Sequence, residues 1–144
     1  MSKRPEITKM LSLSVRRHIN QRNDPRIYWA AEVTFDYGTS NAIRVDFMRF
    51  KPVNNTISGI EKGDFYCYEV KSSVQDFHSR NGHNFIGDFN YYVMPEDVYE
   101  QVKNEIPHRV GAVSYTHLKS ITKGTTEPVK TSVWSLEASH GYKQ

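Results

Sequence analysis

The sequence predicts an α/β fold in which a central mixed sheet of about four to five strands is flanked by helices. Apolar residues recur at spacings of three and four near the N-terminus and again after position 95, as in amphipathic helices. Between these regions lie short segments of alternating aromatic and β-branched residues, which are typical of strands. The 144 residues suffice for one hydrophobic core, and no break in composition separates two. We therefore expect a single domain over 1–144, with its core at about 5–114 and a C-terminal extension at about 115–144.

The first expected elements are a helix and a β-hairpin. One apolar stripe runs from Ile7 to about Arg22, and Pro5 fits the first turn of that helix. The strand-forming segments 26–35 and 42–50 flank the turn-forming residues DYGTSN, so we expect them to pair as a hairpin. The following segment, 51–63, contains Pro, Asn and Gly and is expected to be a loop.

The second half of the chain alternates strands and helices. In order, we expect a strand at 64–71, a helix capped by Ser72 or Ser73 and ending at Arg80, a strand at 90–94, a helix from Pro95 to Glu105 and a strand at 110–115. No periodic pattern predicts the structure of the segment from about Thr116 onward.

Composition excludes several classes of protein. No stretch approaches the roughly 20 apolar residues of a membrane span, and the N-terminus lacks the apolar run of a secretory signal, so we expect a cytoplasmic protein with no membrane partner. The single cysteine, Cys67, can form no internal disulfide and is expected to be a buried strand residue. The sequence has neither the glycine-rich phosphate loops of nucleotide-binding proteins nor a serine nucleophile elbow.

Positive charge is concentrated at the N-terminus. The formal net charge is +3, but residues 1–26 carry seven Lys and Arg side chains against Glu6 and Asp24. Such a basic segment suits contact with phosphate, although an ordinary solvated helix face has the same composition. The candidate DNA-binding residues are Arg16, Arg17, Arg44 and Arg80.

Two carboxylates and a lysine form the candidate catalytic site. Residues two apart in a strand share a face, so Glu69 and Lys71 project together while Val70 points to the opposite face. Asp46 lies in the preceding strand of the predicted meander. If these two strands pair antiparallel, Asp46 lies beside Glu69, at roughly the 5 Å of a cross-strand pair.

Two buried carboxylates at this separation require a compensating cation. Mg²⁺, or Mn²⁺ in its place, would suit Asp46 and Glu69, with the backbone carbonyl of Val70 as a further oxygen ligand. Lys71 would then face the metal-bound water and stabilise charge that develops on a phosphate, so phosphodiester hydrolysis is the expected reaction. The alternative is an ion pair among these side chains on an exposed strand face.

This pattern resembles the PD-(D/E)XK nuclease superfamily, with Asp46 as its acidic first half and residues 69–71 as its (D/E)XK half. The segments EVKSSVQDF and GHNFIGDFNYYVMPEDVY are more closely similar to MmcB-like DNA repair proteins and related phage proteins, over about residues 28 to 112. The resemblance implies a restriction-endonuclease-like core. Val45 stands where many members have the Pro that precedes the acid.

The resemblance also implies that residues after the triplet support the site, which points to Ser73, Asp76 and Phe77. Many members carry a further glutamate on their first helix. The candidates here are Glu6 and Glu32, and Glu32 is preferred because it lies in a strand near the predicted site.

Other ring-bearing side chains receive no catalytic role. His78 and His83 are expected to be exposed loop residues, since no Cys or His partner lies at zinc-ligand spacing. Tyr91 and Tyr92 are expected to pack in the core rather than stack on bases, because they lie on a predicted central strand.

Three functions remain open at this stage. The first is a Mg²⁺-dependent deoxyribonuclease in DNA repair, recombination or phage DNA metabolism. The second is a nuclease-like DNA-binding or accessory module that is weakly active or inactive within a larger complex. The third is a structural protein whose acidic pair lies on the surface. The expected partner is DNA, and the expected assemblies are a homodimer or a larger repair or phage complex.

Overall fold

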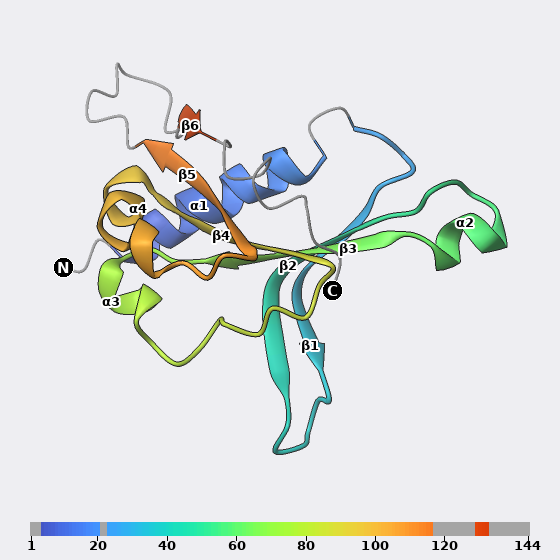
Figure 1. Cartoon of the computed structure of the whole chain (residues 1–144), viewed down its shortest axis with the longest axis horizontal. Helices are drawn as coiled ribbons and strands as arrows, with labels where there is room; N and C mark the ends of the chain where they lie inside the picture. The colour runs from blue at the N-terminus through green and yellow to red at the C-terminus, as the bar shows by residue number, and fades with distance from the viewer. Residues whose placement is uncertain (1–3, 21–22, 117–128, 133–144) are drawn as a thin grey trace.

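The computed structural model describes residues 4–20, 23–116 and 129–132 (Figure 1). The helices are α1 (Arg4–Ile19), α2 (Ile57–Glu61), α3 (Val74–Phe77), α4 (Glu96–Val102) and the 3-10 helix η1 (Lys103–Glu105). The strands are β1 (Tyr28–Phe35), β2 (Ile43–Lys51), β3 (Asp64–Val70), β4 (Phe89–Pro95), β5 (Val110–Thr116) and β6 (Val129–Ser132). The predicted α/β class is confirmed.

The strands form one open mixed sheet in the order β1-β2-β3-β4-β5-β6. The β1–β2, β2–β3 and β5–β6 pairs are antiparallel, whereas β3–β4 and β4–β5 are parallel. The parallel pairs follow from the crossovers that contain α3 and α4, because a parallel partner requires the chain to return along the sheet. The described residues contain six strands, one more than the upper expectation, since β6 extends the edge beside β5.

Helix α1 covers one face of the sheet. Its residues Leu11, Val15 and Ile19 are almost completely buried and pack with the tyrosines of the central strands, including Tyr68 and Tyr91. The predicted apolar stripe therefore forms the main contact between helix and sheet. The helix ends at Ile19, three residues before the expected end.

Helix α4 and the buried Phe77 of α3 cover the opposite face of the sheet. Tyr92 and Met94 of β4 pack there with Phe77 and Val102, whereas Tyr91 points to the α1 face. This alternation is the strand period of two residues, and it leaves β4 buried on both faces. The prediction that Tyr91 and Tyr92 are core residues is confirmed.

Three predicted local elements differ in the structure. The expected loop at 51–63 contains α2, whose first turn is capped when Thr56 Oγ1 accepts from the N–H of Gly59. Ser73 caps α3 as predicted, but α3 ends at Phe77 rather than Arg80. The helix after β4 is α-helical only to Val102 and continues as η1. The local pattern predicts the positions of α3 and α4 better than their lengths, and it does not predict α2.

The structure also bears on two predictions made from composition, the burial of Cys67 and the absence of a membrane span. Cys67 is buried, and that burial together with the nearby charge of Glu69 raises the pKa of its thiol to about 12. In the described part of the chain, no helix combines the length and apolarity needed to cross a bilayer.

Candidate active site

The candidate site lies where strands β2 and β3 separate. Their pairing ends at Phe47 and Tyr68, whereas β1 and β2 stay paired almost to the hairpin turn, so the hairpin projects from the sheet (Figure 1). At the point of separation, Oδ2 of Asp46 accepts a hydrogen bond of 2.8 Å from the backbone N–H of Val70. The carboxylate thus takes the place that a backbone carbonyl would occupy in a continuous ladder.

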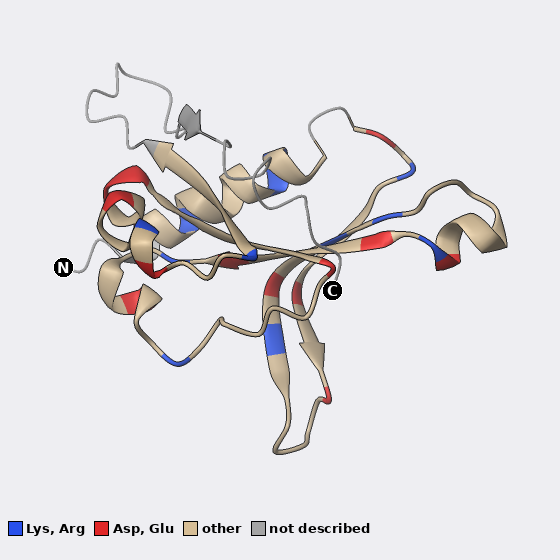
Figure 2. Ribbon diagram, viewed as in Figure 1, with Lys and Arg blue, Asp and Glu red and all other residues tan. Residues whose placement is uncertain are grey.

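Acidic side chains occupy one row across neighbouring strands. Glu69 pairs with Tyr92 of β4, and extending the β2–β3 register by one residue places Asp46 opposite Glu69. The register of the neighbouring pairs places Glu32 of β1 opposite Asp46. The φ of Glu32, +54°, interrupts the hydrogen-bond ladder between β1 and β2 at that point. Residues in register on adjacent strands share a face, so the predicted neighbourhood of Asp46 and Glu69 is present. Figure 2 shows the acidic positions of β1 and β2 at the base of the hairpin.

The electrostatics of this row are unfavourable for two anions. Glu69 is 5% exposed, and burial together with the charge of Asp46 raises its pKa from 4.5 to about 8, although Lys71 opposes the change. Near neutral pH the Glu69 carboxyl therefore holds a proton unless a cation replaces it.

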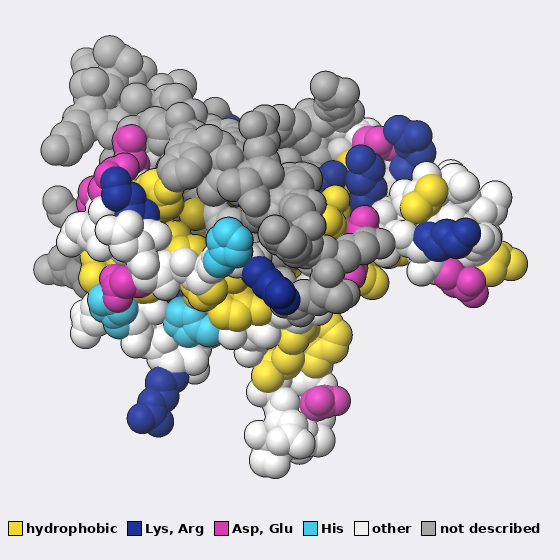
Figure 3. Space-filling model, viewed as in Figure 1, with side chains coloured by type: hydrophobic (Ala, Val, Ile, Leu, Met, Phe, Trp, Pro, Cys, Tyr) yellow, Lys and Arg dark blue, Asp and Glu magenta, His cyan; other side chains and the backbone are white. Residues whose placement is uncertain are grey.

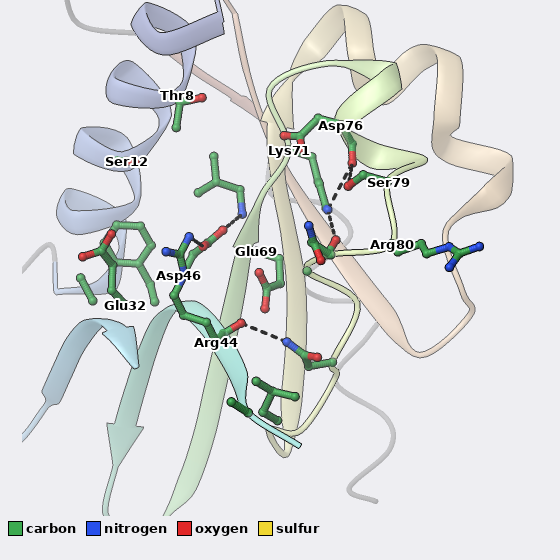
Figure 4. Close-up of a pocket in the computed structure, with 18 of the residues that line it drawn as sticks. Thr8, Ser12, Glu32, Arg44, Asp46, Glu69, Lys71, Asp76, Ser79 and Arg80 are labelled. Atoms are coloured by element: carbon green, nitrogen blue, oxygen red, sulfur yellow. Dashed lines mark hydrogen bonds and ion pairs between the residues drawn. The ribbon is translucent and has the colours of Figure 1, made fainter. Parts of the chain in front are cut away.

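Lys71 enters the same pocket and is 2% exposed. Its Nζ donates to the backbone carbonyls of Asn81, at 2.5 Å, and of Asp76, at 3.3 Å (Figure 4). Gly82 lies directly against the pair, because a Cβ there would stand 2.9 Å from Nζ of Lys71 and 3.1 Å from Oε2 of Glu69. Lys71 and Glu69 thus share one face, as their spacing predicts, and the loop after α3 closes over them.

A pocket of about 1040 Å³ opens at this point. Its walls come from α1, the β1–β2 hairpin, the end of β3 and the loop after α3. Three arginines line it, one from each of α1, β2 and that loop: Arg16, Arg44 and Arg80. Arg44 lies with Nη2 3.6 Å from Oδ1 of Asp46. The mixture of a buried and a partly buried carboxylate with exposed guanidinium groups suits an anionic ligand accompanied by a cation.

The remaining predicted site residues differ in whether they line the pocket. Glu32 lines the pocket on the far side of Asp46 from Glu69 (Figure 4). Asp76 also lines it, but its Oδ2 accepts from the N–H and the hydroxyl of Ser72, at 3.0 and 3.2 Å, which stabilises the turn into α3. Ser73 acts as the N-cap of α3 and does not line the pocket.

Arg17 lies apart from the pocket, and the expectation for His83 is revised. Arg17 is exposed on α1 and does not line the pocket, because it is one residue from Arg16 and so points about 100° around the helix. His83 is not a free loop residue: it is half-buried, with both ring nitrogens in hydrogen bonds. His78 is exposed, as expected, and contacts Glu105 at 2.8 Å.

Sequence reasoning missed the loop residues that complete the pocket. Asn81 supplies a carbonyl to Lys71, Gly82 permits the close approach, and Asn84 donates through Nδ2 to the carbonyl of Arg44 at 3.0 Å. Gly82 has a φ of +73°, a conformation that L side chains rarely adopt. The sequence RNGHN is a signal for a turn here, but it does not reveal which strands that turn approaches.

The donor set is compatible with a hard divalent cation. No group of three or more His, Cys, Asp or Glu side chains suited to a metal occurs among residues 4–20, 23–116 and 129–132. Mg²⁺, however, commonly uses one or two carboxylates and completes its shell with water and substrate phosphate. Asp46 and the buried Glu69 provide these two carboxylates, and burial together with the charge of Asp46 raises the pKa of Glu69, so a cation bound between them would favour its ionised form.

The fold and the pocket thus define an α/β protein with a carboxylate and lysine site at the fork of an open mixed sheet. Comparisons of the chain with models of protein families, with curated proteins and with solved structures gave no match.

Proposed function

We propose that this chain is a metal-dependent deoxyribonuclease that hydrolyses DNA phosphodiester bonds. The observation that carries the proposal is one pocket, edged by arginines, that holds the partly buried Asp46 beside the buried side chains of Glu69 and Lys71. The resemblance of these residues to the PD-(D/E)XK pattern supports the same activity and suggests a role in DNA repair, recombination or phage DNA metabolism.

Asp46 and Glu69 would hold Mg²⁺ or Mn²⁺, as two neighbouring carboxylates of the pocket. Such a cation polarises the scissile phosphate and lowers the pKa of water. The arginines bind the flanking phosphates, and Arg44 stands nearest to the carboxylates. Lys71 contributes a fixed positive charge beside Glu69, in a position where it lowers the cost of negative charge in the pocket.

A second function is favoured by the hydrogen bonds of Lys71. Its ammonium donates to two backbone carbonyls, Asn81 and Asp76, so it serves as a structural anchor for the loop. A DNA-binding accessory module with this pocket would use the arginines without turnover. Salt-dependent DNA binding without cleavage in Mg²⁺ or Mn²⁺ distinguishes this module from the nuclease.

The test of the proposed function is cleavage of labelled single-stranded, double-stranded and branched DNA in Mg²⁺ or Mn²⁺. We expect Asp46→Asn and Lys71→Met to lose cleavage by at least about a hundredfold. Asp97→Asn and Lys103→Met remove the same charges from exposed positions on α4 and η1 and should cleave at the wild-type rate. Absence of cleavage by the purified wild-type protein on all three substrates would overturn the nuclease proposal.

A further inference from the structure

Helix α3 and the loop after it hold the ammonium group of Lys71. The two carbonyls that accept from Nζ belong to Asp76 and Asn81, and Gly82 packs against both Lys71 and Glu69. The position of Lys71 therefore depends on the path of the chain between α3 and residue 82. A displacement of this short segment would withdraw the Asn81 carbonyl from Lys71 and open the space above Glu69.

His83 joins this segment to the sheet. Its Nε2 lies 2.8 Å from the carbonyl oxygen of Ser79, which can only accept, so Nε2 is the donor. Its Nδ1 lies 2.6 Å from the hydroxyl of Tyr92, and in the neutral ring Nδ1 accepts from that hydroxyl. One ring thus connects the start of the loop to a strand.

The strand residue that His83 contacts is a rigid anchor. Tyr92 is 1% exposed and lies beside Glu69 in the register of β3 and β4. Its ring also packs edge-to-face against Phe77 of α3, with ring centroids 5.1 Å apart. His83 itself contacts Phe77 in the same manner, at 5.9 Å. The loop is therefore fixed to the same row of the sheet that carries the carboxylates.

We propose that His83 is a positioning residue, which holds segment 79–82 against Tyr92 and thereby keeps Lys71 and Glu69 in place within the pocket. His83 follows Gly82 directly, so its two hydrogen bonds act at the end of the loop nearest to the site. The other described histidine of this region, His78, contacts Glu105 at the surface. Figure 3 shows histidine side chains on the face that includes α3 and α4.

The direct test measures how accessible Lys71 is. Limited acetylation with acetic anhydride, followed by mass spectrometry of the peptides, gives the rate at Lys71 relative to exposed Lys103. His83→Leu removes both hydrogen bonds but leaves a side chain that fills part of the same space, and we expect labelling of Lys71 to rise about tenfold. Tyr92→Phe removes one bond and retains the ring, and a rise of about threefold to fivefold is expected.

Two further variants separate positioning from a general loss of structure. His83→Gln carries a donor and an acceptor and should hold Lys71 labelling within about threefold of the wild type. His78→Ala breaks only the exposed contact with Glu105 and should leave Lys71 labelling unchanged. If His83→Leu does not fold, Tyr92→Phe decides the question. Labelling of Lys71 in the folded variants at the wild-type rate would overturn the positioning role.

The consequence for catalysis rests on the proposed nuclease function. In that case His83→Leu should lower kcat by about tenfold to a hundredfold with little change in KM, and His83→Gln should restore most of kcat. If the wild-type protein cleaves no DNA, the nuclease proposal fails, while the labelling of Lys71 still decides the role of His83. An unchanged kcat in a folded, active His83→Leu protein would also overturn the inference.

Discussion

Replacing Glu69 with Gln is expected to stabilise the metal-free protein while removing the activity proposed for it. The pKa of Glu69 is raised from 4.5 to about 8 by burial and by the charge of Asp46. A carboxyl group with a raised pKa binds its proton more tightly in the folded state, so the free energy of unfolding falls as the pH rises. The loss begins near pH 4.5 and is complete above about pH 8. Gln has the same shape and no charge, so the variant avoids this loss.

The size of the effect follows from the same two pKa values. The interval from 4.5 to about 8 corresponds to about 5 kcal/mol at about 1.4 kcal/mol per pH unit, which is an upper limit because the pocket is open to water. We expect Glu69→Gln to exceed the wild type by about 1 to 3 kcal/mol at pH 9 and by almost nothing at pH 4. For a chain of this length, each kcal/mol corresponds to a few degrees in Tm.

The assay is urea unfolding followed by circular dichroism at pH 4, 6, 7.5 and 9, in EDTA. The matched control is Glu100→Gln, which removes a carboxylate from the exposed surface of α4. Addition of Mg²⁺ at pH 7.5 should stabilise the wild type and leave Glu69→Gln unaffected, because a ligand that binds only the folded state raises its stability. A Glu69→Gln protein that is equal to or less stable than the wild type at pH 9 would refute the reasoning.

Further predictions concern the packing and charge of the same pocket. Gly82→Ala places a Cβ against Lys71 at a φ of +73° and should lower the free energy of unfolding by about 1 to 2 kcal/mol, measured by urea unfolding. Asp46→Ala removes the acceptor of the Val70 N–H, whereas Asp46→Asn retains an oxygen there. The free energy of unfolding should therefore be lower for the Ala variant than for the Asn variant by about 1 to 3 kcal/mol. Equal free energies of unfolding for the two variants would contradict this. Arg44→Ala should reduce the slope of log K against log salt for DNA binding by about 1 in fluorescence anisotropy. An equal effect from changing Arg17, which lies outside the pocket, would argue against a specific path for DNA.

Local sequence patterns predict most of the elements and half of the candidate site. The apolar stripe of α1, the alternation of β2 and β3 and the turn between β1 and β2 are each encoded within a few residues, because helix and strand periods decide which side chains face a core. The same period places Glu69 and Lys71 on one face without any knowledge of the tertiary structure. Ser73 as a helix cap is a signal of the same local kind.

The rest of the site depends on contacts between distant segments. That Asp46 lies beside Glu69 depends on the register of β2 and β3, which is set across the intervening chain that contains α2. The loop that brings Gly82 and His83 back onto the sheet has a turn signal but no local pattern that names its target.

The sequence by itself therefore determined which residues share a face, the α/β class and, apart from α2, the order of helices and strands up to β5. The tertiary structure alone decided that β2 and β3 separate at Asp46, that β6 joins the sheet and that backbone carbonyls hold Lys71. The physical reason is that periodicity acts over a few neighbouring residues, whereas register, loop docking and burial arise from the packing of the whole domain.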